Sequence, residues 1–89
     1  MEKFVVFGEY CEDAIIKREP FRKQHLDRLK NLKDRNILVT LGPTKCTKYL
    51  FGIFNANDEY QIRDFIEKDI YWEKGIWINY KIYPWVQVF

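Results

Sequence analysis

The sequence predicts an α+β domain of the ferredoxin-like type, with an antiparallel sheet, two helices on one face and elements in the order βαββαβ. Four short segments rich in β-branched and aromatic residues are interrupted by two longer segments whose apolar residues recur every three or four positions. The 89 residues, 47% of them hydrophobic and 18% aromatic, are enough for one packed core. We therefore expect a single domain over residues 1–89.

The first half of the chain carries one predicted strand and one predicted helix. Residues 3–10 contain the apolar run 4–7, which is typical of a strand. The polar residues 11–19 are expected to form a loop. A helix should begin at Pro20, because the missing N–H of proline costs nothing at the first helical position, and should end near Asp34.

Two strands are predicted in the middle of the chain. Residues 37–41 are β-branched and apolar, and Gly42 and Pro43 are expected to end this strand. A turn over residues 44–47 leads into the next strand, over residues 48–54.

The last part of the chain predicts a helix followed by a strand. Asn57 is expected to cap a helix that runs to about Lys68. Residues 76–83 alternate with a period of two, which indicates a strand. Pro84 is expected to interrupt this strand, after which residues 85–89 continue as extended chain.

Both faces of the predicted sheet carry apolar side chains, and the last strand is heavily aromatic. Two helices cover only one face, so a monomer would expose a large apolar patch on the other. We therefore expect a homodimer in which two sheets pack face to face, an arrangement known as the dimeric α/β barrel.

Composition argues against several classes of partner. The 15 Lys and Arg residues nearly balance the 13 Asp and Glu residues, so the net charge of +2 does not predict a nucleic-acid partner. No apolar stretch approaches the ~20 residues that span a membrane, and no signal segment is found, so we expect a cytoplasmic protein without a membrane partner. Cys11 and Cys46 form no CxxC motif and the chain has one histidine, so we expect neither a metal nor another cofactor.

The single histidine, His25, lies on an apolar stripe of the first helix, four residues after Phe21 and four before Leu29. A buried imidazole is costly unless its nitrogens have partners, and histidine is the side chain whose unperturbed pKa lies near neutrality. In this topology the start of the first helix neighbours the end of the second, where Asp69 lies. The pair is either an acid–base dyad or a buried brace between two helices.

Two arginines and a glycine-proline pair are candidates for ligand binding. Arg22 lies one turn before His25, and Arg18 lies just before Pro20, so both guanidinium groups would suit a carboxylate, phenolate or phosphate near the helix start. Gly42 and Pro43 would let the backbone approach a ligand closely. The alternatives are solvated surface arginines and a plain turn.

The segment over residues 17–26 resembles the R-x-x-x-R-x-x-H-L motif of YciI-like (YCII-related) proteins. Further matches follow in the same order along nearly the whole chain: Leu41-Gly42-Pro43, Asp69, Lys74-Gly75-Ile76, Pro84-Trp85 and Val88-Phe89. The resemblance implies a ferredoxin-like fold that dimerises as an α/β barrel. It also implies that His25 and Asp69 form an active-site dyad.

Most members of that family have no assigned reaction, and some are associated with dehydrochlorination of hydroxylated aromatic rings. The chain departs from the family in two places. Ile70 follows Asp69 where the family usually has proline, from which we expect a different backbone there, and the loop after Pro43 is short.

Two functions are therefore predicted. In the first, the protein is a small cofactor-free enzyme of the lyase or isomerase type that acts on a small anionic or phenolic molecule. His25 would be the base or acid, Asp69 would orient it, and Arg22 with Arg18 would hold the negative charge. In the alternative, the protein is a non-catalytic module for small-ligand binding or interaction, with a structural His25–Asp69 pair.

Overall fold

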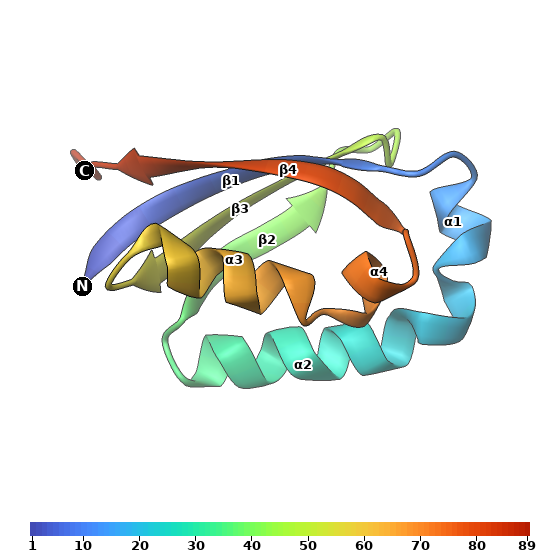
Figure 1. Ribbon diagram of the computed structural model, residues 1–89, viewed down its shortest axis with the longest axis horizontal. Helices are drawn as coiled ribbons and strands as arrows, with labels where there is room; N and C mark the ends of the chain where they lie inside the picture. The colour runs from blue at the N-terminus through green and yellow to red at the C-terminus, as the bar shows by residue number, and fades with distance from the viewer.

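A computed structural model describes all 89 residues as one four-stranded antiparallel sheet with helices on one face (Figure 1). The elements in chain order are β1 (Glu2–Tyr10), α1 (Ala14–Lys17), α2 (Arg22–Asp34), β2 (Leu38–Pro43), β3 (Tyr49–Ala56), α3 (Glu59–Glu67), α4 (Ile70–Glu73) and β4 (Trp77–Trp85). The strand order is β2-β3-β1-β4, and every neighbouring pair is antiparallel. This is the predicted ferredoxin-like α+β fold.

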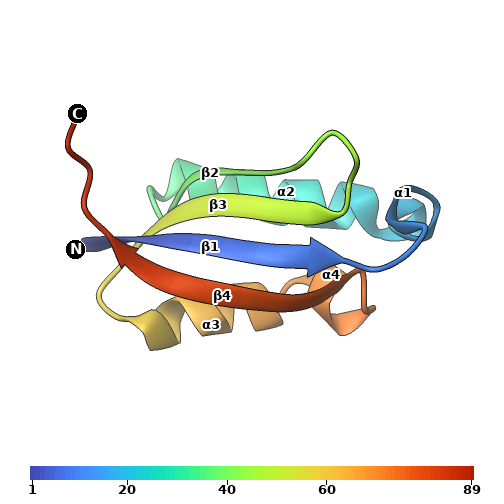
Figure 2. The same ribbon diagram turned by 90° about the horizontal axis from the view of Figure 1, so that it is seen from above.

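The core lies between the sheet and the two long helices. Seen from above, the sheet forms one layer, with α2 beneath the β2 side and α3 beneath the β4 side (Figure 2). Alternate residues of the central strands point inward, and β1 places Phe4 and Val6 in the core while β3 places Leu50 and Phe54 there. The helices contribute Leu32, Ile62 and Ile66.

Both predicted proline breaks are wrong. Strand β2 continues through Pro43, and β4 continues through Pro84 to Trp85. The reason is that β2 and β4 are the two edges of the sheet. Because half of the backbone groups of an edge strand face away from the sheet, a missing N–H is tolerated there.

The segment between β1 and α2 is not a loop. It contains α1 and a 3₁₀ turn over Glu19–Phe21 that holds Pro20, so the long helix begins at Arg22. The predicted cap of α3 is wrong by one residue. Asp58 is the N-cap, and its carboxylate accepts from the Gln61 N–H at 3.0 Å.

The face of the sheet opposite the helices is covered by no element (Figure 2). Phe7 lies on this outer face, 48% exposed, with its ring centroid 5.2 Å from that of Phe51 and 6.3 Å from that of Tyr83. The outer face is therefore an uncovered aromatic surface.

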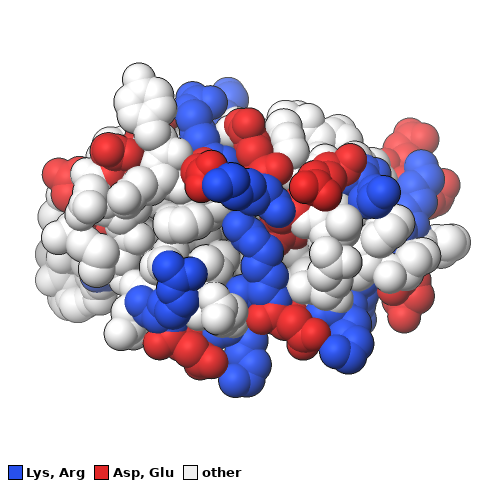
Figure 3. Space-filling view, turned by 60° about the horizontal axis from the view of Figure 1, so that its bottom comes forward, with Lys and Arg blue, Asp and Glu red and all other residues white.

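The helix side of the molecule carries charges of both signs in close alternation (Figure 3). Four ion pairs link side chains one helical turn apart: Lys23–Asp27, Lys30–Asp34, Arg63–Glu59 and Lys68–Asp64. None of the helices combines the length and apolar character needed to cross a lipid bilayer.

Candidate active site

A cavity of about 130 Å³ lies beside the start of α2, near the ends of β1 and β2. We call it the His25 cavity. It is lined by all of the predicted site residues except Asp69, namely Arg18, Arg22, His25, Gly42 and Pro43. Tyr10 and Tyr71 also line it. The fold thus brings together residues that are spread over most of the chain.

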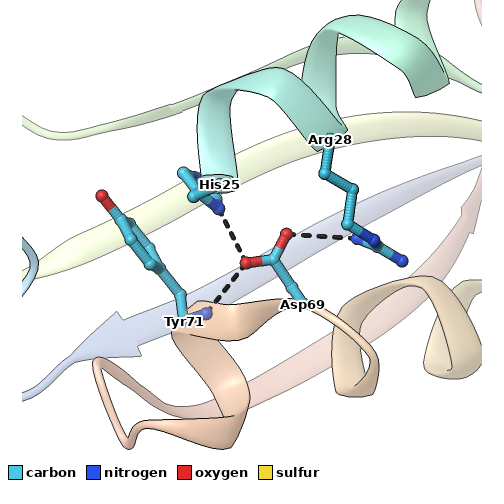
Figure 4. Close-up of polar contacts among 4 residues, drawn as sticks. All are labelled: His25, Arg28, Asp69 and Tyr71. Carbon is cyan, nitrogen blue, oxygen red and sulfur yellow. Dashed lines mark hydrogen bonds and ion pairs between the residues drawn. The ribbon is translucent and has the colours of Figure 1, made fainter. Parts of the chain in front are cut away.

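His25 is fixed on three sides. Its Nδ1 lies 2.7 Å from Oδ1 of Asp69 (Figure 4), and the two side chains are only 6% and 1% exposed. The imidazole stacks on the ring of Tyr71 with centroids 3.6 Å apart, and the Trp77 ring meets it edge-on at 5.1 Å. Because the ring cannot turn freely, its second nitrogen keeps a defined position.

Asp69 is held by three hydrogen bonds and by its place in the chain. It is the N-cap of α4, and its Oδ1 accepts from the Tyr71 N–H at 2.9 Å. Its Oδ2 accepts from Nη1 of Arg28 at 3.1 Å (Figure 4). Asp69 has no exposed surface, so these donors replace the water that a carboxylate would otherwise bind.

This pattern fixes the tautomer of a neutral His25. An ionised carboxylate only accepts hydrogen bonds, and both Asp69 oxygens already accept from N–H groups. Nδ1 of His25 therefore carries a proton and donates a hydrogen bond to Asp69, which leaves Nε2 as the unprotonated nitrogen of the neutral ring.

The cavity also presents positive charge and hydroxyl donors. Arg22 lies at the exposed rim, and Nε of Arg18 is buried without a hydrogen-bond partner in the protein. Burial raises the pKa of both Tyr10 and Tyr71 above the ordinary tyrosine value. Both phenols are therefore protonated at neutral pH and can donate to an anionic ligand.

Three residues of the site were not predicted. Arg28 lies three positions after His25, hence on the same side of α2, and this spacing is the signal that would have indicated it. Tyr71 follows Asp69 by two positions, but its stacking on His25 depends on α4, which the sequence did not predict. Tyr10 is the last residue of β1, and it lines the cavity only because the folded chain places the end of β1 beside the start of α2.

A second hollow, of about 810 Å³, lies between α1 and the turn that joins β2 to β3. It is wider and more open, and its lining includes Cys11 and Cys46 but neither histidine nor arginine. A hydrogen bond with Thr44 Oγ1 lowers the pKa of the Cys46 thiol. The smaller His25 cavity is nevertheless the better candidate of the two, because its lining combines an oriented histidine with two arginines.

The fold and site define a class: small ferredoxin-like proteins with a buried histidine–aspartate pair beside a narrow, positively charged cavity. The chain belongs to the YCII-related domain family, whose sequence model matches residues 2–86. It is 27% identical over 96 residues to an uncharacterised protein of Haemophilus influenzae, and the match covers 97% of this chain and 98% of that protein.

A solved structure has the same fold. It is a 5-chloro-2-hydroxyhydroquinone dehydrochlorinase from Burkholderia phenoliruptrix AC1100, in complex with 2,5-dihydroxybenzoquinone. The TM-score is 0.80 at 20% sequence identity, and the match covers 94% of this chain and 93% of that chain. At this identity the likeness establishes the architecture.

Proposed function

We propose that the protein is a cofactor-free acid–base enzyme, of the lyase or isomerase type, acting on a small anionic or phenolic molecule. The observation that carries this proposal is the orientation of His25. Its Nδ1 is held by the buried carboxylate of Asp69, and His25 lines a cavity that Arg18 and Arg22 also line. This is the arrangement that proton transfer to and from a bound anion requires.

In the proposed mechanism, the ligand enters with its ionised oxygen toward Arg22 and Arg18. Nε2 of His25 removes a proton from the ligand, and Asp69 stabilises the imidazolium that forms. An isomerase returns this proton to another atom of the same molecule. In a lyase, the electrons of the broken C–H or O–H bond form a new double bond while the leaving group departs as an anion with its bonding pair, and the proton on Nε2 then passes to solvent or to that anion.

The size of the cavity limits the ligand. A volume of about 130 Å³ is close to that of an engineered apolar cavity of ~150 Å³ that binds benzene. This volume suits one six-membered ring. Gly42 and Pro43 line the same cavity as the arginines, and in this proposal their backbone lies against the edge of the ring.

The structural neighbour supplies the first compounds to try. Its described activity is dehydrochlorination of a hydroxylated ring, and its bound ligand is a dihydroxylated quinone. Compounds of that size and charge match the cavity of this chain. We therefore propose hydroxylated six-membered rings as the substrate class.

The test is turnover of 5-chloro-2-hydroxyhydroquinone, followed as release of chloride. Wild-type protein should release chloride, and His25→Gln should lower the rate about 10²- to 10⁴-fold, the usual contribution of a positioned acid–base group. Lys23→Ala is the matched control, because Lys23 lies on the same helix with its side chain 90% exposed. Equal rates for wild type and a correctly folded His25→Gln variant would exclude this mechanism.

The alternative is a non-catalytic module that binds a small ligand. The observation in its favour is that the His25–Asp69 contact joins α2 to the cap of α4, as a structural brace would. Such a protein would bind 2,5-dihydroxybenzoquinone, but it would turn over no hydroxylated ring. A binding titration beside the chloride assay separates the two functions.

We also propose that the protein works as a homodimer, with the outer faces of two sheets packed together. The uncovered aromatic surface around Phe7 supports this, because contiguous exposed apolar patches mark interaction sites. A cytoplasmic location agrees with two free cysteines, since thiols persist in reducing compartments.

A further inference from the structure

We propose that Arg28 is a positioning residue that keeps His25 in its neutral, proton-accepting form by balancing the charge of Asp69. This inference deepens the proposed function. It rests on that function for one point, the role of His25 as a base. Arg28 does not line the His25 cavity, so it acts through Asp69 and not on the ligand.

The first step of the argument is geometric. Arg28 and His25 reach the same carboxylate from successive turns of α2, and each takes a different oxygen (Figure 4). The distances are 3.1 Å from Nη1 of Arg28 to Oδ2 and 2.7 Å from Nδ1 of His25 to Oδ1. The Asp69 side chain is 1% exposed and that of Arg28 is 28% exposed, so this ion pair is largely withdrawn from water.

The second step is a count of charge. With Arg28 positive, Asp69 negative and His25 neutral, the buried cluster carries no net charge. An additional proton on His25 would leave one uncompensated positive charge among buried groups, which is costly. Without Arg28, the same proton would instead neutralise Asp69, and the imidazolium would be favoured.

The third step concerns the other groups near the ring. Those with titratable or charged side chains are Arg18 before α2, Arg22 at its start, Tyr10 of β1 and Tyr71 of α4. The two arginines are positive and oppose an imidazolium in the same direction as Arg28 does. The two phenols add no negative charge, since burial raises their pKa. The anion beside His25 is therefore Asp69, and Arg28 is its counter-charge.

The experiment uses the fact that the chain has a single histidine. In ¹⁵N-labelled, tag-free protein, the imidazole nitrogens give one set of resonances that reports both tautomer and protonation. The neutral variants Arg28→Gln and Arg28→Met should move the titration midpoint of His25 to higher pH. Arg28→Lys, which keeps the charge, should restore it toward the wild-type midpoint.

Arg63→Gln is the matched control, because Arg63 pairs with Glu59 at 3.2 Å on the surface of α3. This variant should leave the imidazole spectrum unchanged. The amide spectrum of each variant verifies the fold. Two neutral substitutions are made because one folded neutral variant is enough for the test.

Equal midpoints for wild type and a folded neutral variant would overturn the inference. An equal displacement in Arg63→Gln would also overturn it, because the effect would then not be local to Asp69. Neither result depends on turnover. A protein that turns over no hydroxylated ring would remove the proposed function and leave this titration result standing.

Discussion

Among the buried polar side chains, that of Asp69 should cost the most unfolding free energy to remove. A second aspartate, Asp58, provides the control. Asp69→Ala deletes the acceptor of three hydrogen bonds at a position with no exposed surface. It also removes the N-cap of α4. Asp58→Ala deletes the N-cap of α3, where the carboxylate accepts one hydrogen bond, from Gln61 at 3.0 Å, on an exposed residue.

The two substitutions share one effect and differ in another. Loss of an aspartate cap costs about 1 kcal/mol of unfolding free energy, which is what we expect for Asp58→Ala. Breaking a buried ion pair by removing one partner costs about 3–5 kcal/mol, and Asp69→Ala leaves both His25 and Arg28 without their acceptor. A chain of 89 residues is stabilised by about 4–13 kcal/mol in total. Asp69→Ala should therefore remove a large part of the stability.

Urea denaturation followed by tryptophan fluorescence measures both variants at one fixed protein concentration, which keeps any contribution of association constant. Because the loss of a cap is common to both variants, the expected loss for Asp69→Ala exceeds that for Asp58→Ala by the contribution of the buried contacts, about 3–5 kcal/mol. Equal losses would refute the reasoning, because they would mean that the buried contacts of Asp69 add nothing to its role as a cap.

Two further predictions concern pH and association. Burial and the hydrogen bond to Glu67 raise the pKa of Tyr80 to about 12. An unfolded chain loses this proton near pH 10, so between pH 10 and about 12 the folded chain binds more protons than the unfolded chain. The free energy of unfolding therefore falls as pH rises through this range. Tyr80→Phe should flatten this fall in urea denaturation at pH 9 and pH 11, and an unchanged slope would count against it. Phe7→Glu should place a charge on the outer face and convert a dimer to a monomer in sedimentation velocity. Tyr60→Glu, at an 80% exposed residue of α3, should not, and a dimeric Phe7→Glu variant would count against the face-to-face arrangement.

The element order was predictable because each segment carries its own periodicity, which depends on residues a few positions apart. The proximity of His25 and Asp69 was also predictable, because antiparallel helices in this topology bring the start of one beside the end of the other. Neither inference needs the details of packing. The continuation of the strands through Pro43 and Pro84 could not be predicted in this way. A proline breaks a central strand but not an edge strand, and whether a strand lies at an edge depends on the assembled sheet.

The rest of the site depends on contacts that no local pattern records. Helix α4 has four residues, too few for a helical period to be recognised, and Asp69 caps its start. Tyr71 stacks on His25 only because α4 turns it toward α2. Arg28 has the spacing of a neighbour of His25, but a surface arginine on a helix has the same spacing.

The cap of α4 also explains how Ile70 stands where the family usually has proline. The expected change in the backbone is not found: Asp69 has φ −74° and ψ 142°, the extended conformation to which a residue before proline is restricted. Ile70 is the first helical residue, the position at which proline is favoured because its N–H has no helical partner. Isoleucine thus adopts the local geometry that proline would favour. Unlike proline, it does not lower the conformational entropy of the unfolded chain. In this chain the position of Asp69 depends instead on its contacts with His25, Arg28 and the Tyr71 N–H, so the residues of the proposed chemistry also stabilise the local fold.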